Sequence, residues 1–148
     1  MSKRELGEAY FKEGYNCTQA VVLAFREEIG LDEHTALMLA SPFGGGMGRL
    51  REVCGAVSGM FMVLGALCGY TDPKDNTEKK ALYADVQALA AAFRERNRSI
   101  VCRELLGLPG AESDPTPDAR TEAYYKKRPC ALLVGDACEI LEDYLKNN

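Results

Sequence analysis

The chain has 148 residues, a formal net charge of −4 and a hydrophobic content of 47%. This length and composition are typical of one domain with a buried core, and we predict a single domain over residues 1–148. A chain with a pI near 5.1 has no excess of Lys and Arg for a phosphate backbone, which excludes nucleic acid as a partner.

The N-terminal residues indicate where the protein resides. They are charged and run directly into a helical pattern, unlike the apolar core of a secretory signal. The longest uncharged run, after Val53, is shorter than the roughly 20 apolar residues of a membrane span. We therefore predict a cytoplasmic protein with no membrane span.

Apolar residues recur at helical spacing along most of the chain, and alternating strand patterns are nearly absent. We expect an all-α, single-domain bundle of about six or seven helices around a central apolar helix. The expected helices run from about Ser2 to Glu13, Asn16 to Glu28, a short segment after Asp32, Arg51 to Cys68, Asn76 or Thr77 to Asn97, Ile100 to Leu106, and Pro129 to Lys146. Asn16, Asp32 and Ser99 are the expected N-caps, because their side chains accept bonds from free helix amides.

Cysteine is frequent for an intracellular chain. The six are Cys17, Cys54, Cys68, Cys102, Cys130 and Cys138. In a reducing compartment such residues are more often metal ligands or redox centres than structural bridges. No Cys-x-x-Cys occurs, so thioredoxin-type and paired zinc-knuckle sites lack their local signatures. The single histidine, His34, excludes sites built from several imidazoles.

Four cysteines share one kind of position, at or near a predicted helix start. They are Cys17 after Asn16, Cys54 about one turn into the apolar helix, Cys102 shortly after Ser99, and Cys130 after Pro129. Free amides and the helix dipole stabilise a thiolate there, and cationic neighbours such as Arg49, Arg51, Arg103 and Arg128 add to this effect. One such cysteine alone is more often a packing residue, whereas four predict a functional set. Cys68 and Cys138 are expected to be ordinary core cysteines.

Two groups of glycines are candidates for close contact with a ligand. The loop Gly44-Gly45-Gly46-Met47-Gly48-Arg49 has the composition of an anion-binding nest, although a hinge or packing loop explains it equally well. Gly55 and Gly59 lie one turn apart in the apolar helix, where glycine is unfavourable unless another helix or a cofactor approaches the backbone. The predicted cofactor-binding set is Gly44, Gly45, Gly46, Arg49, Gly55 and Gly59.

The order of these motifs resembles a known family. The segments are Asn16-Cys17-Thr18-Gln19-Ala20-Val21, Phe43 to Gly48, and Cys54-Gly55-Ala56-Val57-Ser58-Gly59, followed by Cys102 and Cys130. Together they resemble the C_GCAxxG_C_C family of redox-active proteins. The resemblance implies that Cys17, Cys54, Cys102 and Cys130 are the family cysteines and that the role is redox-linked. The family label writes Gly-Cys-Ala where this chain has Cys-Gly-Ala.

Three functions remain open at this stage. The first is a thiol–disulfide or electron-transfer protein in which Cys54 pairs with Cys17, Cys102 or Cys130, served by a redox partner protein or a small-molecule electron carrier. The second is a binding module in which the same four cysteines hold an iron–sulfur cluster or a single metal ion. The third is a structural or partner-binding helical protein. The glycine-lined apolar helix also suggests a homodimer.

Overall fold

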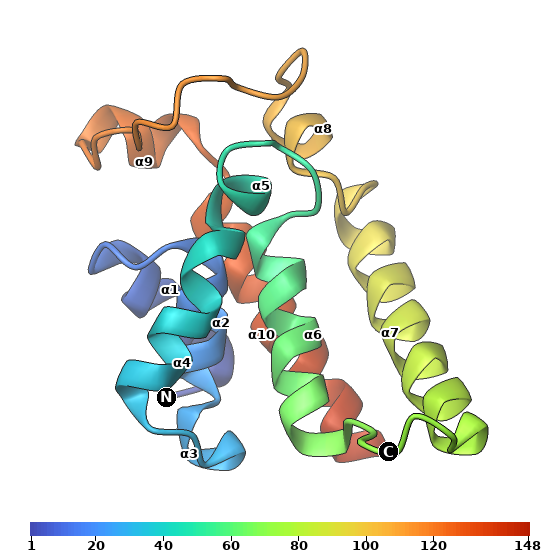
Figure 1. Ribbon diagram of the computed structural model, residues 1–148. Coiled ribbons are helices and arrows are strands. Elements are labelled where there is room, and N and C mark those ends of the chain that lie inside the picture. The colour runs from blue at the N-terminus through green and yellow to red at the C-terminus, as the bar shows by residue number, and fades with distance from the viewer.

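The computed structural model describes residues 1–148 and contains helices and no β-sheet (Figure 1). The elements are α1 Lys3–Lys12, α2 Cys17–Ala24, α3 Arg26–Ile29, α4 Glu33–Ala40, a 3₁₀ turn η1 Ser41–Phe43, α5 Gly44–Met47, α6 Gly55–Cys68, α7 Asn76–Asn97, α8 Cys102–Leu106, α9 Glu122–Lys127 and α10 Cys130–Asn147. Gly45 and Gly46 have left-handed dihedrals, so α5 is a turn and nine α-helices remain. The all-α prediction is confirmed, with more and shorter helices than expected.

Side-chain caps explain where several helices begin. Asn16 and Gln19 form a capping box at α2, and Asp32 accepts from the Thr35 amide at α4. Two of the three predicted caps, Asn16 and Asp32, are therefore confirmed. The long helix α7 also has its predicted bounds, with Asp75 as the cap that accepts from Glu78.

Two helices differ from the sequence prediction. The expected helix from Asn16 to Glu28 is interrupted at Phe25, which leaves helical geometry and is only 1% exposed. Burial of this ring in the core accompanies the break between α2 and α3. Helix α9, capped by Thr121, was not expected, because its polar six-residue segment has no apolar periodicity.

The core is built around α6, as predicted. Val57, Met60, Val63 and Leu64 of this helix are almost fully buried and belong to a single apolar cluster. Helix α6 packs on α2, α7 and α10, while α1 packs on α10 and α2. Helices α2, α6 and α10 begin at the same end of the bundle, beside α5 (Figure 1). Residues at their starts are therefore brought together.

The two glycines of α6 permit a close approach of α2. A Cβ at Gly59 would lie 2.8 Å from the Cβ of Val21 and 3.0 Å from the Thr18 carbonyl oxygen. A Cβ at Gly55 would lie 2.8 Å from the Thr18 hydroxyl. Both glycines therefore serve a helix contact, one of the two predicted roles. None of the helices combines the length and apolar character needed to cross a membrane.

Candidate functional site: a four-cysteine pocket

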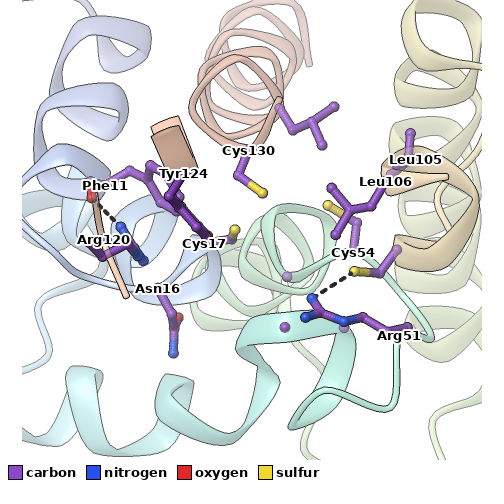
Figure 2. Close-up of a pocket in the computed structure, with 15 residues that line it drawn as sticks. Phe11, Asn16, Cys17, Arg51, Cys54, Leu105, Leu106, Arg120, Tyr124 and Cys130 are labelled. Carbon is purple, nitrogen blue, oxygen red and sulfur yellow. Dashed lines mark hydrogen bonds between the residues drawn. The ribbon is translucent and has the colours of Figure 1, made fainter. Parts of the chain in front are cut away.

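Cys17, Cys54, Cys102 and Cys130 line one cavity of about 60 Å³ at the end of the bundle where α2, α6 and α10 begin (Figure 2). We call this cavity the thiol pocket. Its other lining residues are Phe11, Asn16, Gly45, Gly46, Arg51, Gly55, Leu105, Leu106, Arg120, Tyr124 and Leu133. Four cysteines that lie far apart in the sequence thus share one small space.

Cys54 and Cys102 are placed by a short antiparallel bridge rather than by regular helix. Val53 pairs with Val101, the Cys54 amide donates to Ile100 O at 2.7 Å, and the Cys102 amide donates to Glu52 O at 2.5 Å. Because side chains alternate along extended backbone, the residues after Val53 and Val101 point to the same side. The pairing explains why both cysteines reach the pocket.

This pairing corrects two predicted helix starts. Helix α6 begins at Gly55, so Cys54 is its N-cap and does not lie one turn inside it. Helix α8 has Val101 as its N-cap, and Ser99 instead accepts from the Val101 amide. Both predictions were wrong because the extended backbone before each cysteine is held by a partner 48 residues away.

Cys17 and Cys130 begin α2 and α10, and both side chains point into the pocket (Figure 2). The pKa of Cys130 is lowered to about 7, chiefly because the Cys17 thiol acts as a hydrogen-bond donor to it. The charges of Arg128 and Arg120 and the hydroxyl of Tyr124 act in the same direction, against burial. The same interaction raises the pKa of Cys17. Within this pair the pKa of Cys130 is lowered and that of Cys17 is raised.

Cys54 and Cys102 have the opposite acid–base behaviour. Burial raises the pKa of Cys54 to about 12, which outweighs the amides of Ala56 and Val57 that favour its thiolate. Burial also raises the pKa of Cys102, although Arg51 Nη1 lies 3.7 Å from its sulfur and opposes the shift. Of the four cysteines only Cys130 has a lowered pKa, and the groups that lower it are side chains rather than helix amides.

Tyr124 and Arg120 shape the wall beside Cys130. The Arg120 guanidinium donates to the carbonyls of Phe11 and Tyr15, both at 2.9 Å, and its Cζ lies 4.1 Å from the Phe11 ring centroid. It also lies over the Tyr124 ring. These contacts fix α9, and with it Tyr124, against α1. Nothing in the sequence pattern singled out these two residues, because neither follows a motif or a helix start.

The glycine loop forms a left-handed turn against the pocket. Residues 45–49 all have positive φ, between 61° and 72°. At Gly46 a Cβ would lie 2.5 Å from the Cβ of Cys102, and at Gly44 it would meet the Asn16 side chain. Only glycine leaves room at these two positions. The loop therefore contributes part of the pocket wall through its backbone.

Arg49, one of the predicted cofactor-binding residues, holds the segment between α8 and α9. We call residues 107–121 the connector. Arg49 pairs with Glu112 and, at 3.3 Å, with Asp118 of this segment. Arg51, only 4% exposed, pairs with Glu112 at 3.1 Å. Arg128 pairs with Asp118 at 3.1 Å. The connector is thus held across the end of the bundle where the thiol pocket lies (Figure 1).

The two remaining cysteines lie outside the pocket. Cys138 is fully buried, as predicted. Cys68 is exposed at the last residue of α6, so its assignment to the core was wrong. The helix end there projects beyond the packed part of the bundle, where Leu67 is also exposed.

The positions of the potential metal ligands bear on the metal-binding prediction. No group of three or more His, Cys, Asp or Glu side chains lies close enough to hold one metal ion. The four cysteines share a cavity wall without forming such a group. The single-metal interpretation therefore finds no ligand set in this arrangement, and the iron–sulfur interpretation, which needs more widely spaced sulfurs, stays a prediction.

The fold and the pocket define a class of small, all-helical proteins in which cysteines from several helix starts surround one cavity. Residues 15–144 match the family described as "Putative redox-active protein (C_GCAxxG_C_C)". The chain belongs to this family, as its motif order indicated. A search of curated proteins found no match, and neither did a search of solved structures.

Proposed function

We propose that this protein is a thiol–disulfide redox protein in which Cys130 is the attacking thiolate and Cys17 the second thiol. The observation that carries this proposal is that both side chains line the thiol pocket, where interaction with Cys17 lowers the pKa of Cys130 and interaction with Cys130 raises that of Cys17. A thiolate is the nucleophile in disulfide exchange, and an attacking thiol with a pKa near ambient pH is the most effective. Membership of a redox-active family supports the same assignment.

The reaction proceeds in two exchanges. The Cys130 thiolate attacks one sulfur of a substrate disulfide, forms a mixed disulfide and releases the other sulfur as a thiolate. Cys17 then gives its proton to that leaving thiolate and attacks the Cys130 sulfur, which releases the second half of the substrate as a thiolate that takes a proton from water. The protein loses two electrons and gains a Cys17–Cys130 disulfide, and the substrate becomes two thiols.

Cys54 and Cys102 have no part in these two exchanges. Burial keeps both protonated at neutral pH, because the pKa of each is raised. This assignment differs from the first sequence hypothesis, which placed Cys54 at the centre of the exchange. The acid–base difference between the two pairs favours Cys130 as the nucleophile.

Disulfide mapping tests the proposal. The reduced protein is oxidised with a small disulfide, its remaining thiols are blocked, and its peptides are identified by mass spectrometry without reduction. We expect a peptide pair that joins Cys17 to Cys130, with Cys54, Cys68, Cys102 and Cys138 blocked as thiols. A first-formed disulfide that omits Cys130 would overturn the assignment.

A further inference from the structure

A second cavity adjoins the thiol pocket. It has a volume of about 370 Å³, and all but one of its lining residues are polar, charged, glycine or proline. The two cavities share the wall residues Asn16, Gly45, Arg51, Arg120 and Tyr124. Asn16 precedes Cys17, and Tyr124 acts on the Cys130 sulfur. The common wall therefore lies beside the proposed reactive pair, and we call the second space the outer cavity.

The walls of the two cavities are positively charged, although the whole chain carries −4. The thiol pocket is lined by Arg51 and Arg120 and by no carboxylate. The outer cavity adds Arg49 and one acid, Asp118. Carboxylates also lie behind these walls, since Glu112 pairs with Arg49 and Arg51, and the exposed Asp114 lies near Arg49.

Arg120 is the cation best placed to act on a ligand. Its guanidinium has no carboxylate partner and donates only to backbone carbonyls and to the Tyr125 hydroxyl. It lines both cavities. Its charge therefore remains uncompensated by a neighbouring acid at the wall that the two cavities share.

The dimensions of the cavities restrict the substrate. Cys54, Cys102 and Cys130 are each at most 7% exposed, and the thiol pocket itself admits only a small group. Because Cys130 is only 7% exposed, a small disulfide reaches its sulfur more readily than a disulfide within a folded protein does. The outer cavity, by contrast, falls within the range of about 300–1,000 Å³ typical of small-molecule sites.

We propose that the substrate of the Cys17–Cys130 pair is a small anionic disulfide, bound in the outer cavity with its carboxylates toward Arg49, Arg51 and Arg120. This inference rests on the thiol–disulfide function proposed above. One substrate sulfur accepts the Cys130 thiolate, and the other leaves as a thiolate beside Arg120. The mixed disulfide is then resolved by Cys17, which leaves the protein oxidised by two electrons and the substrate as two anionic thiols.

Three small disulfides of similar size and different charge test this proposal: dithiodiglycolate with two carboxylates, bis(2-hydroxyethyl) disulfide without charge, and cystamine with two ammonium groups. The rate of protein thiol loss is measured with each at low ionic strength. Each rate is divided by that of the same disulfide with dithiothreitol, because leaving-group pKa alters intrinsic reactivity. We expect the anion to exceed the cation by about tenfold or more, as local steering produces. The net charge of the whole chain alone predicts the reverse order.

Two further measurements identify the cause of the expected preference for the anionic disulfide. At about 1 M salt, where the Debye length is about 3 Å, the anion preference should shrink toward unity. Arg49→Gln should lower the ratio of the anion rate to the neutral rate. Arg94→Gln removes the same charge from an exposed position on α7 and should leave that ratio unchanged. A circular dichroism melt of each variant checks that the fold is retained.

The outcomes separate this inference from the proposed function. If the Cys17–Cys130 disulfide forms but cystamine reacts fastest after normalisation, or charge has no effect, the anionic substrate is wrong and the thiol–disulfide function stands. If insulin disulfides react faster than dithiodiglycolate, the substrate is a protein and the inference is overturned. If no disulfide oxidises the pair, both proposals fail.

Discussion

Cys17 and Cys130 occupy one half of the thiol pocket, and Cys54 and Cys102 occupy the other. The two halves share one kind of position in the fold but differ in how their sulfurs ionise. All four stand at or just before a helix start. Only the Cys130 sulfur has a thiol donor, a phenol and two arginine charges acting together on it. Burial dominates at Cys54 and Cys102. The comparison teaches that a helix start is insufficient to make a thiolate unless polar groups compensate the loss of water.

The strongest test of this difference removes one sulfur from each half. Cys130→Ser should abolish disulfide reduction, because a serine hydroxyl is not ionised near neutral pH and cannot form the mixed disulfide. Cys54→Ser makes the same chemical change on the other side of the pocket and should retain most of the activity. The assay follows the thiol released from a small disulfide. Equal losses in the two variants would remove the distinction between the halves.

The pH dependence of alkylation tests the cause of the difference. The thiolate of Cys130 should increase with a midpoint near pH 7, because its pKa is lowered, whereas Cys54 should stay unreactive until far higher pH. Compared with a thiol of pKa 8.5, Cys130 has about fifteenfold more thiolate at pH 7. Since a less basic thiolate is also a weaker nucleophile, the net gain in rate is about threefold. Mass spectrometry of each cysteine peptide after iodoacetamide pulses gives the profiles.

Variants of Cys17 test whether its hydrogen bond or the nearby arginines lower the pKa of Cys130. They are measured in the same alkylation experiment. Cys17→Ala removes the donor that contributes most to the shift, so the Cys130 midpoint should rise toward about 8.5. Cys17→Ser retains a hydroxyl donor and should raise the midpoint less. A midpoint that stays near 7 in Cys17→Ala would assign the shift to the arginines instead.

The helix contact that joins the two halves can be altered from a distance. Gly59→Ala should cost about 1–3 kcal/mol of unfolding free energy, because the added methyl overlaps Val21 and the Thr18 carbonyl between α2 and α6. Gly65→Ala is the matched control in the same helix, where a Cβ meets nothing within 4 Å. Gly65→Ala should raise the unfolding free energy by about 0.5–1 kcal/mol, because alanine restricts the unfolded chain more than glycine does. Urea denaturation measures the unfolding free energy of both variants. Similar values for the two would contradict the close packing of α2 and α6.

The smallest effect is expected at a cysteine outside the pocket. Cys68→Ser should change the unfolding free energy by less than about 0.5 kcal/mol, since the side chain is exposed. Cys138→Ser places a hydroxyl at a fully buried site and should destabilise the protein clearly. The two are compared by urea denaturation. A large loss at Cys68 would mean that its surface is covered in solution.

Much of the fold was predictable because its signals are local. Asn16 and Asp32 cap helices through bonds to amides three residues away, and the apolar spacing of α7 is complete within its own sequence. The start of α6 was predicted wrongly because it depends on a residue far away in the sequence. Residues before Cys54 are held extended by Val101, and no local pattern reveals that pairing.

The four cysteines of the pocket were identified from the sequence, but their ionisation was not. Helix position is a property of neighbouring residues, whereas the pKa of each sulfur depends on what packs against it. Arg120 reaches the pocket from the connector and binds carbonyls 105 and 109 positions earlier in the chain. The same tertiary contact determines the position of Tyr124. Such groups are found only after the fold is known.

The contact between α1 and α10 determines the order in which the pocket can be assembled during folding. These helices lie near opposite ends of the sequence, and α10 supplies Cys130 while α1 supplies the carbonyl of Phe11 that holds Arg120. Pairing segments so far apart closes a large loop, which costs chain entropy. Cys17 is synthesised before its proposed partner Cys130 exists. The nascent chain therefore acquires its reactive pair only when its last helix docks.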